Sequence, residues 1–238
     1  MTNIVEWWWC LKEKLSIIYK ILIVIVSGIG LYLNFKLVGI QHSVIYFTIL
    51  SNLYCFLFYL ITLLLKLKNK LKKADIYYFV KGSMVMSLTI TMIMFQLFLA
   101  NSNEIKSISN SLLETGIVHI LVPTLVIYDY IFFGEKGKAK IKFAFEWSLI
   151  LILYLVFWFI YTSLGGLFIN GTIYPYFYMN IEELGIKSVI VNNVLIYISF
   201  ILLGILIIFV DKLIARDNEK IERWWRLYGK FKRTNWYT

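Results

Sequence analysis

Six apolar stretches, each long enough to cross the hydrocarbon core of a bilayer, dominate this sequence. A membrane-spanning helix needs about 17–25 predominantly apolar residues. The stretches cover residues 15–33, 44–65, 77–99, 112–133, 143–164 and 188–210. Because lipid offers no hydrogen-bond partner to backbone N–H and C=O groups, stretches of this length must form helices. The sequence therefore predicts an all-α integral membrane protein, built as a bundle of six transmembrane helices.

The composition excludes the other broad classes of protein. Hydrophobic residues make up 60% of the chain and charged residues only 16%, whereas soluble domains contain about 45–50% and about 25%. Phe (18), Tyr (17) and Trp (8) are abundant and Pro occurs twice, which is the opposite of a disordered chain. A soluble fold and an unfolded chain are both excluded.

The distribution of positive charge predicts the orientation of the bundle. The chain has 24 Lys and Arg against 14 Asp and Glu. With six spans, only Lys36, Lys106 and Lys187 fall on one side, and the other 21 of the 24 basic residues fall on the side of both termini. Basic loops face the cytoplasm in most membrane proteins, so both termini are expected to be cytoplasmic. This asymmetry accounts for the net charge of +10 without a nucleic-acid partner.

Residues 1–211 are expected to form a single transmembrane domain and residues 212–238 a basic, aromatic tail. The tail is shorter than the roughly 50 residues that a folded domain needs. Its mixture of Arg, Lys, Trp and Tyr is typical of a segment that lies at the membrane interface, although binding to a partner stays open. Any chemical function must then lie among the spans.

Several kinds of active site are not indicated. The chain has two histidines, His42 and His119, and no H-x-x-x-H or C-x-x-C spacing, so no metal site and no cofactor are predicted. Neither a phosphate-binding G-x-x-x-x-G-K-[ST] loop nor a G-x-S-x-G nucleophile motif occurs. Cys10 and Cys55 fall at different depths, and no disulfide is expected.

Polar residues inside the spans mark the candidate site, because such residues are costly in lipid. His119 lies about seven residues into the fourth span and Thr48 four or five residues into the second, and both spans run in the same direction. The two residues therefore share a depth. Further polar residues in the same layer are Ser51, Asn52, Gln96, Thr115, Asn192 and Asn193.

Each of these residues also has a structural interpretation. Ser and Thr hydroxyls commonly bond to backbone carbonyls of their own helix, and Asn and Gln can join neighbouring helices. Pro123 cannot donate to the carbonyl of His119, so the helix is expected to bend there. Asp129 and Glu146 lie at the inner ends of their spans and are expected to pair with the basic inner loops.

Three short motifs resemble the bacterial six-span branch of the androgen-induced gene 1 family. They are Tyr46 to Asn52 (YFTILSN), His119 to Pro123 (HILVP) with Asp129 beyond it, and Tyr174-Pro175-Tyr176 before the last span. In the animal members of that family, a threonine and a histidine form the catalytic pair of a membrane enzyme that hydrolyses fatty acid esters of hydroxy fatty acids. The resemblance implies that Thr48 and His119 are this pair, that Tyr174, Pro175 and Tyr176 form a substrate loop, and that the chain resides in a bacterial plasma membrane.

The first hypothesis is an intramembrane hydrolase or acyltransferase acting on a lipid ester. Thr48 would be the nucleophile, His119 the general base, and Ser51 or Asn52 a donor to the oxyanion. The third catalytic group would be Asn192, Asn193 or absent. The alternative is a membrane protein without enzymatic activity that transports or binds a lipid or another small molecule. Neither hypothesis fixes the oligomeric state.

Overall fold

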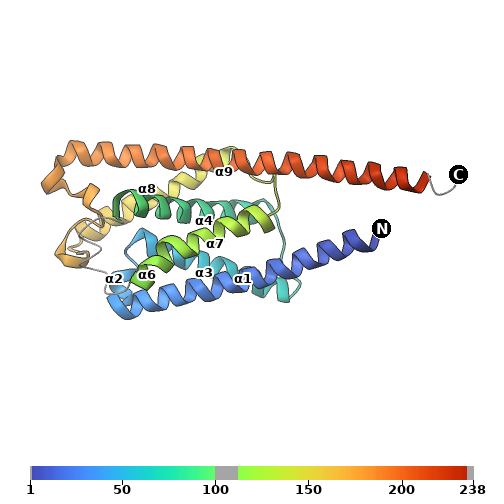
Figure 1. Cartoon of the computed structure of the whole chain (residues 1–238). Helices are drawn as coiled ribbons and strands as arrows, with labels where there is room; N and C mark the ends of the chain where they lie inside the picture. Colours follow the sequence, from blue (N-terminus) through green and yellow to red (C-terminus); the bar gives the residue numbers. More distant parts are fainter. Residues whose placement is uncertain (1, 100–111, 235–238) are drawn as a thin grey trace.

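The computed structural model describes residues 2–99 and 112–234, and within these ranges the regular structure is helical (Figure 1). Lys106 lies outside the described residues. The principal helices are α1 (Thr2–Val38), α2 (Ile40–Ser43), α3 (Phe47–Leu67), α4 (Asp75–Met94), α6 (Leu112–Gly116), α7 (Val122–Tyr128), α8 (Lys142–Ser163) and α9 (Ile181–Thr234). Three π-helical segments, η1 (Phe95–Leu99), η2 (Ile117–Leu121) and η3 (Asp129–Phe133), extend or join them, and two short 3₁₀ turns are η4 (Ile169–Gly171) and η5 (Phe177–Met179).

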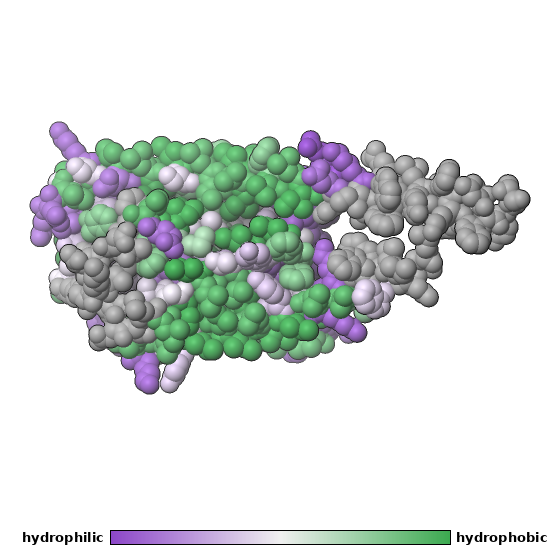
Figure 2. Space-filling view, viewed as in Figure 1, coloured by the Kyte–Doolittle hydropathy of each residue, from purple (hydrophilic) through white to green (hydrophobic). Residues whose placement is uncertain are grey.

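Six of the helical segments in the described residues are long and apolar enough to cross a membrane. They coincide with the six stretches expected from the sequence, which confirms the all-helical fold class. The N-terminus and the C-terminus lie at the same end of the bundle (Figure 1). A broad apolar surface separates hydrophilic residues at the two ends on the face that Figure 2 shows.

Helix α4 occupies the centre of the bundle. It packs against α3, α7, α8 and α9, and it is the most buried and the least apolar of the six spans. Small side chains let its neighbours approach closely. A Cβ atom at Gly82 would lie 2.1 Å from the indole ring of Trp147, which is itself fully buried and donates to the carbonyl of Phe79 at 3.0 Å. The contact between α4 and α8 therefore requires glycine at position 82.

The fourth span is interrupted where Pro123 was expected to disturb it. Pro123 has no N–H to donate to the carbonyl of His119. The helix widens just before the proline, and the N–H of Val122 bonds to the carbonyl of Ile117, five residues back. The expected disturbance thus takes the form of the π-helical segment η2, which carries His119. Isolated π turns are often found at functional sites.

Helix α9 continues beyond the boundary predicted for the tail. The backbone stays helical from the last span to Thr234, and the only non-helical residue in the range is Gly185, near its start, with φ of 75°. Figure 1 shows the end of α9 projecting past the other helices. The segment expected to be a separate tail is thus a direct extension of the sixth span. Its position at a membrane interface stays a prediction.

Candidate functional site

Thr48 and His119 line the same cavity, which we call the Thr48 cavity. Thr48 stands in the first turn of α3, and His119 stands in η2. The remaining wall comes from α3, α4, η1, α8, α9 and the connection between α8 and α9. It consists of Phe47, Ile90, Thr91, Met94, Phe95, Leu151, Tyr154, Leu155, Tyr176, Tyr178, Met179, Asn193, Ile196 and Phe200. The shared depth expected from the sequence corresponds to a shared cavity.

The free space in the Thr48 cavity is small. The volume open to the centres of water molecules is about 40 Å³. Because one water occupies about 10–15 Å³ by this measure, roughly three waters fit. Most of the wall is apolar, and the polar atoms come from a few hydroxyl, imidazole and amide groups. Such a site has room for water next to Thr48 and His119, and most of its wall is apolar.

His119 is oriented by its own helix. Its Nδ1 lies 3.1 Å from the carbonyl oxygen of Thr115, which is a hydrogen-bond acceptor only. Nδ1 must therefore carry the proton when the ring is neutral, and Nε2 is then left with its lone pair. The imidazole also stacks on the ring of Phe95, with 4.3 Å between the ring centres. A backbone carbonyl and an aromatic ring thus fix the tautomer and the plane of the ring.

Thr48 is 8% exposed and lies under the connection between α8 and α9. Its hydroxyl is in hydrogen-bonding contact with the hydroxyl of Tyr176, which also contacts Tyr154. Burial raises the pKa of Tyr176, and the hydrogen bonds with Thr48 and Tyr154 oppose that shift. The Tyr176 phenol therefore stays neutral near pH 7 and keeps its proton. Within the described residues, no direct hydrogen bond joins Thr48 to His119, so a proton passing between them needs a water or a change of rotamer.

Asn52 holds the two helices of the site together. Its side-chain nitrogen donates to the carbonyl of Thr48 at 2.9 Å and to the carbonyl of Val118 at 3.0 Å. One amide thus connects the turn that carries Thr48 to the residue next to His119. Asn52 is fully buried and does not line the cavity. In this structure it positions the site and does not reach it.

The other residues of the expected polar layer divide into two groups. Asn193 lines the cavity and donates to the carbonyl of Val189, and Asn192 donates to the carbonyl of Tyr178 at 3.1 Å. Asn192 and the remaining members do not line the cavity. Ser51 bonds to the carbonyl of Phe47, Thr115 bonds to Glu114, and Gln96 is exposed.

The Tyr174-Pro175-Tyr176 segment lies across the start of α3. Tyr176 enters the cavity, Pro175 is buried, and the hydroxyl of Tyr174 accepts a hydrogen bond from Asn180. The Tyr46 ring packs against Phe168 and Tyr176, so the connection between α8 and α9 is fastened to the beginning of α3. Two cavity tyrosines, Tyr154 and Tyr178, were not among the residues singled out from the sequence, because tyrosine is common at the ends of membrane helices.

Asp129 and Glu146 both pair with lysines, but in different surroundings. Glu146 pairs with Lys142 at 3.0 Å, as expected for a residue beside a basic loop. Asp129 is fully buried and pairs with Lys20 of α1 and Lys81 of α4, at 2.9 and 2.6 Å. The expectation that Asp129 pairs with the basic inner loops was therefore wrong, because both of its partners lie inside spans. The available signal in the sequence was that Lys20, Lys81 and Asp129 all lie inside apolar stretches, where charged residues usually pair with one another.

No protein-family model, no curated protein and no solved structure matches this chain. The site is therefore interpreted from its own chemistry and from the three motifs described above.

Proposed function

We propose that this chain is a multi-pass membrane protein that hydrolyses lipid esters, with Thr48 as the nucleophile and His119 as the general base. The observation that carries the proposal is that these two residues, from separate helices, line one small cavity in which the histidine tautomer leaves Nε2 unprotonated. Membership of the androgen-induced gene 1 family, in its bacterial six-span branch, is part of the proposal and rests on the three motifs.

The reaction would proceed in two steps. The Thr48 Oγ attacks the ester carbonyl carbon while its proton passes to His119 Nε2, through one of the waters that the cavity accommodates. The carbon–oxygen bond to the alcohol breaks, and the departing oxygen takes the proton from His119. Water then attacks the acyl–threonine by the same route, which releases the fatty acid and restores Thr48. A second alcohol in place of this water would make the enzyme an acyltransferase.

The donor to the oxyanion is assigned to Tyr176 rather than to Ser51 or Asn52. The Tyr176 hydroxyl lines the cavity beside Thr48, whereas Asn52 donates to two backbone carbonyls and Ser51 to one. A neutral phenol is a hydrogen-bond donor. The Tyr176 O–H can therefore meet the carbonyl oxygen of an ester that Thr48 attacks.

The orientation proposed for the protein places the lysine-bearing connections in the cytoplasm. Residues 68–74 and 134–141 join spans at the end of the bundle that holds both termini. Basic connections remain on the cytoplasmic side during insertion. The Thr48 cavity then lies in the outer half of a plasma membrane, and both termini are cytoplasmic.

The decisive experiment is covalent labelling of the purified protein in detergent with a long-chain fluorophosphonate. Attack by Thr48 Oγ on phosphorus displaces fluoride and leaves a phosphonylated residue that peptide mass spectrometry locates. We expect one adduct on Thr48 and hydrolysis of a long-chain ester by the unlabelled protein. Thr48→Ala and His119→Ala should remove both signals, whereas Thr48→Ser should keep part of each.

Matched controls separate chemistry from folding. Thr89 is a helix threonine outside the cavity whose hydroxyl donates to the carbonyl of Val85, and His42 is exposed in α2. Thr89→Ala and His42→Ala should label and hydrolyse like the wild type. Full ester hydrolysis by folded Thr48→Ala protein would refute the nucleophile assignment and would favour a binding or transport function.

A further inference from the structure

A second cavity lies at the opposite end of α3, and we call it the lysine pocket. Its volume, measured as for the Thr48 cavity, is about 70 Å³. Charged and hydroxyl side chains from α1, α3, α4, α9 and the connections after α3 and η3 line it, among them Lys20, Thr62, Lys66, Lys73, Tyr77 and Lys81. Thr62 stands about 21 Å along α3 from Thr48 at 1.5 Å per residue, so the pocket is separate from the proposed catalytic site.

Two buried lysines at the lysine pocket share one carboxylate. Lys20 is 9% exposed, Lys81 is 5% exposed, and both share the single carboxylate of Asp129. The Asp129 Oδ2 also accepts from Tyr59 at 2.9 Å, and Lys20 meets Oδ1 as a close ion pair at 2.9 Å. Two ammonium groups share one carboxylate here, and Asp211 is the other buried carboxylate at the pocket. One carboxylate neutralises two lysines only in part, so the arrangement favours binding of an anion.

The remaining acidic groups around the pocket are engaged by other partners. Glu135 is held by Lys73 at 2.6 Å and by Tyr78, Lys66 pairs with Glu13 at 2.8 Å, and Asp211 accepts from the Gly137 N–H at 2.7 Å. Counted together, the lining lysines Lys20, Lys66, Lys73, Lys81 and Lys138 face the carboxylates Glu13, Asp129, Glu135 and Asp211. The described groups therefore carry an excess of positive charge even when every carboxylate is ionised.

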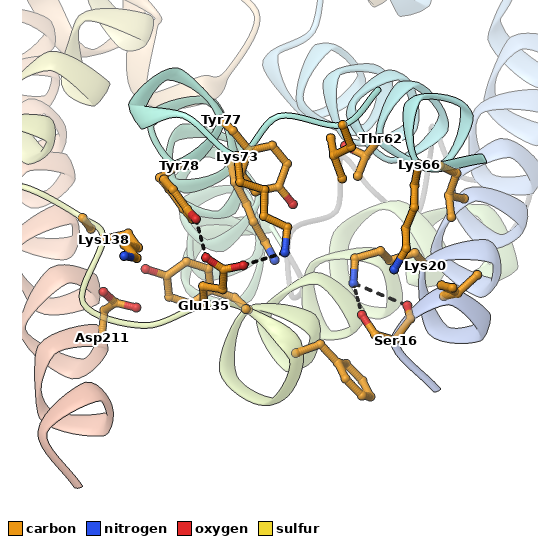
Figure 3. Close-up of a pocket in the computed structure, with 18 residues that line it drawn as sticks. Ser16, Lys20, Thr62, Lys66, Lys73, Tyr77, Tyr78, Glu135, Lys138 and Asp211 are labelled. Atoms are coloured by element: carbon orange, nitrogen blue, oxygen red, sulfur yellow. Dashed lines mark hydrogen bonds and ion pairs between the residues drawn. The ribbon is translucent and has the colours of Figure 1, made fainter. Parts of the chain in front are cut away.

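Charged and neutral hydrogen-bond donors surround the same space. Figure 3 shows Lys20 and Lys66 reaching toward it from one side and Lys73 from the other, with the hydroxyls of Thr62 and Tyr77 between them. Ammonium and hydroxyl groups that converge from several helices suit a tetrahedral oxyanion. By the measure of about 10–15 Å³ per water, the pocket has room for roughly five waters, and a phosphate group has similar bulk.

We propose that the lysine pocket binds the phosphate group of an anionic phospholipid at the cytoplasmic surface. In the orientation proposed above, this end of the bundle faces the leaflet surface rich in anionic headgroups, and basic pockets between membrane helices at that level bind such headgroups. The phosphate would neutralise the excess charge of Lys20 and Lys81, while Lys66 and Thr62 would contact its outer oxygens. This site is independent of the ester hydrolysis proposed for Thr48.

The test is native mass spectrometry of the whole purified protein with defined lipids. The protein in uncharged detergent is titrated with phosphatidylglycerol, with phosphatidylcholine, or with inorganic phosphate. We expect one phosphatidylglycerol to be retained per chain at concentrations at which phosphatidylcholine is not. Displacement of the lipid by millimolar inorganic phosphate would uphold the anion site and assign its occupant to a soluble phosphate.

The variants are chosen to fold. Lys20→Met leaves Lys81 and Asp129 as a balanced pair, Lys66→Gln removes a partly exposed charge, and Thr62→Val keeps the volume of the side chain. Each should weaken phosphatidylglycerol binding roughly fivefold or more, as expected for one lost phosphate contact. Lys142→Gln removes an exposed lysine outside the pocket and should bind like the wild type. Wild-type binding by both Lys66→Gln and Thr62→Val, or an equal loss in Lys142→Gln, would overturn the proposal.

Discussion

The side-chain amide of Asn52 donates to the carbonyl of Val118 at 3.0 Å and thereby fixes α3 against the π-helical segment that carries His119. The same nitrogen bonds to the carbonyl of Thr48. In Asn52→Ala, neither carbonyl keeps this donor, and we expect a loss of about 1–3 kcal/mol in stability. Because the relative position of Thr48 and His119 also changes, kcat for ester hydrolysis should fall at least tenfold with little change in KM.

Asn34→Ala is the matched control for Asn52. Asn34 donates to Glu114 at 2.7 Å in another buried contact between helices, away from the cavity. Its loss should lower the melting temperature by a similar amount but leave kcat of the folded fraction unchanged. Equal loss of kcat in the two variants would show that Asn52 acts on stability alone.

Tyr176→Phe should reduce kcat about 100-fold if the phenol donates to the oxyanion, since removal of one such donor costs about 10²–10³ in rate. The ring is retained, so its packing against Tyr46 is preserved. Tyr161→Phe is the control, because the Tyr161 hydroxyl donates to Leu167 outside the cavity. Steady-state kinetics on a long-chain ester distinguishes the two. An unchanged kcat for Tyr176→Phe would remove Tyr176 from the mechanism.

The orientation is tested by labelling introduced cysteines in intact cells, in a Cys10→Ser background that keeps only the buried Cys55. A cysteine at Asn170, in the connection between α8 and α9, should react with a membrane-impermeant maleimide added from outside. A cysteine at Lys138, beside the lysine pocket, should react only after the cells are opened. The positive-inside distribution predicts this pattern, and the reverse pattern would invert the bundle.

Lys136 should be unusually reactive near neutral pH. Burial lowers its pKa to about 8, and the negative charge of Asp211 opposes the shift. An ordinary lysine has a pKa of about 10.4, so Lys136 carries far more neutral amine at pH 8. Its acetylation rate, followed by peptide mass spectrometry from pH 6.5 to 9.5, should rise through a midpoint of about 8. Asp211→Asn should move that midpoint lower, and a midpoint near that of an ordinary lysine would contradict the prediction.

Gly82→Val should destabilise the bundle more than Gly116→Val. A Cβ atom at Gly82 would overlap the buried indole of Trp147, whereas a Cβ at Gly116 meets no atom within 4 Å. Overpacking of this kind costs about 1–3 kcal/mol, and occasionally more. The measurement is the thermal unfolding of the purified protein in detergent. Equal stability of the two variants would show that α4 and α8 can move apart at little cost.

The sequence by itself determined the helices and the depth of the candidate pair. Runs of apolar residues about 20 long have one stable backbone arrangement in lipid, since every N–H and C=O group must be satisfied within the segment. The shared depth of Thr48 and His119 follows from the helical rise and from the direction of each span. Pro123 also predicted a disturbance beside His119, because the missing N–H is a local property of that residue.

Only the tertiary structure decided which polar residues face one another. The depth of a residue along its helix does not fix the rotation of that helix about its axis or the helices that pack against it. A lipid-facing stripe is also as apolar as a buried one. The sequence therefore suggested Asn52 as a donor to the oxyanion, yet Asn52 does not line the cavity and donates to two backbone carbonyls. Lys20, Lys81 and Asp129 are far apart in sequence, and their ion cluster exists because α1, α4 and η3 pack together. Such contacts depend on side-chain packing between helices, which the order of residues along one helix does not encode.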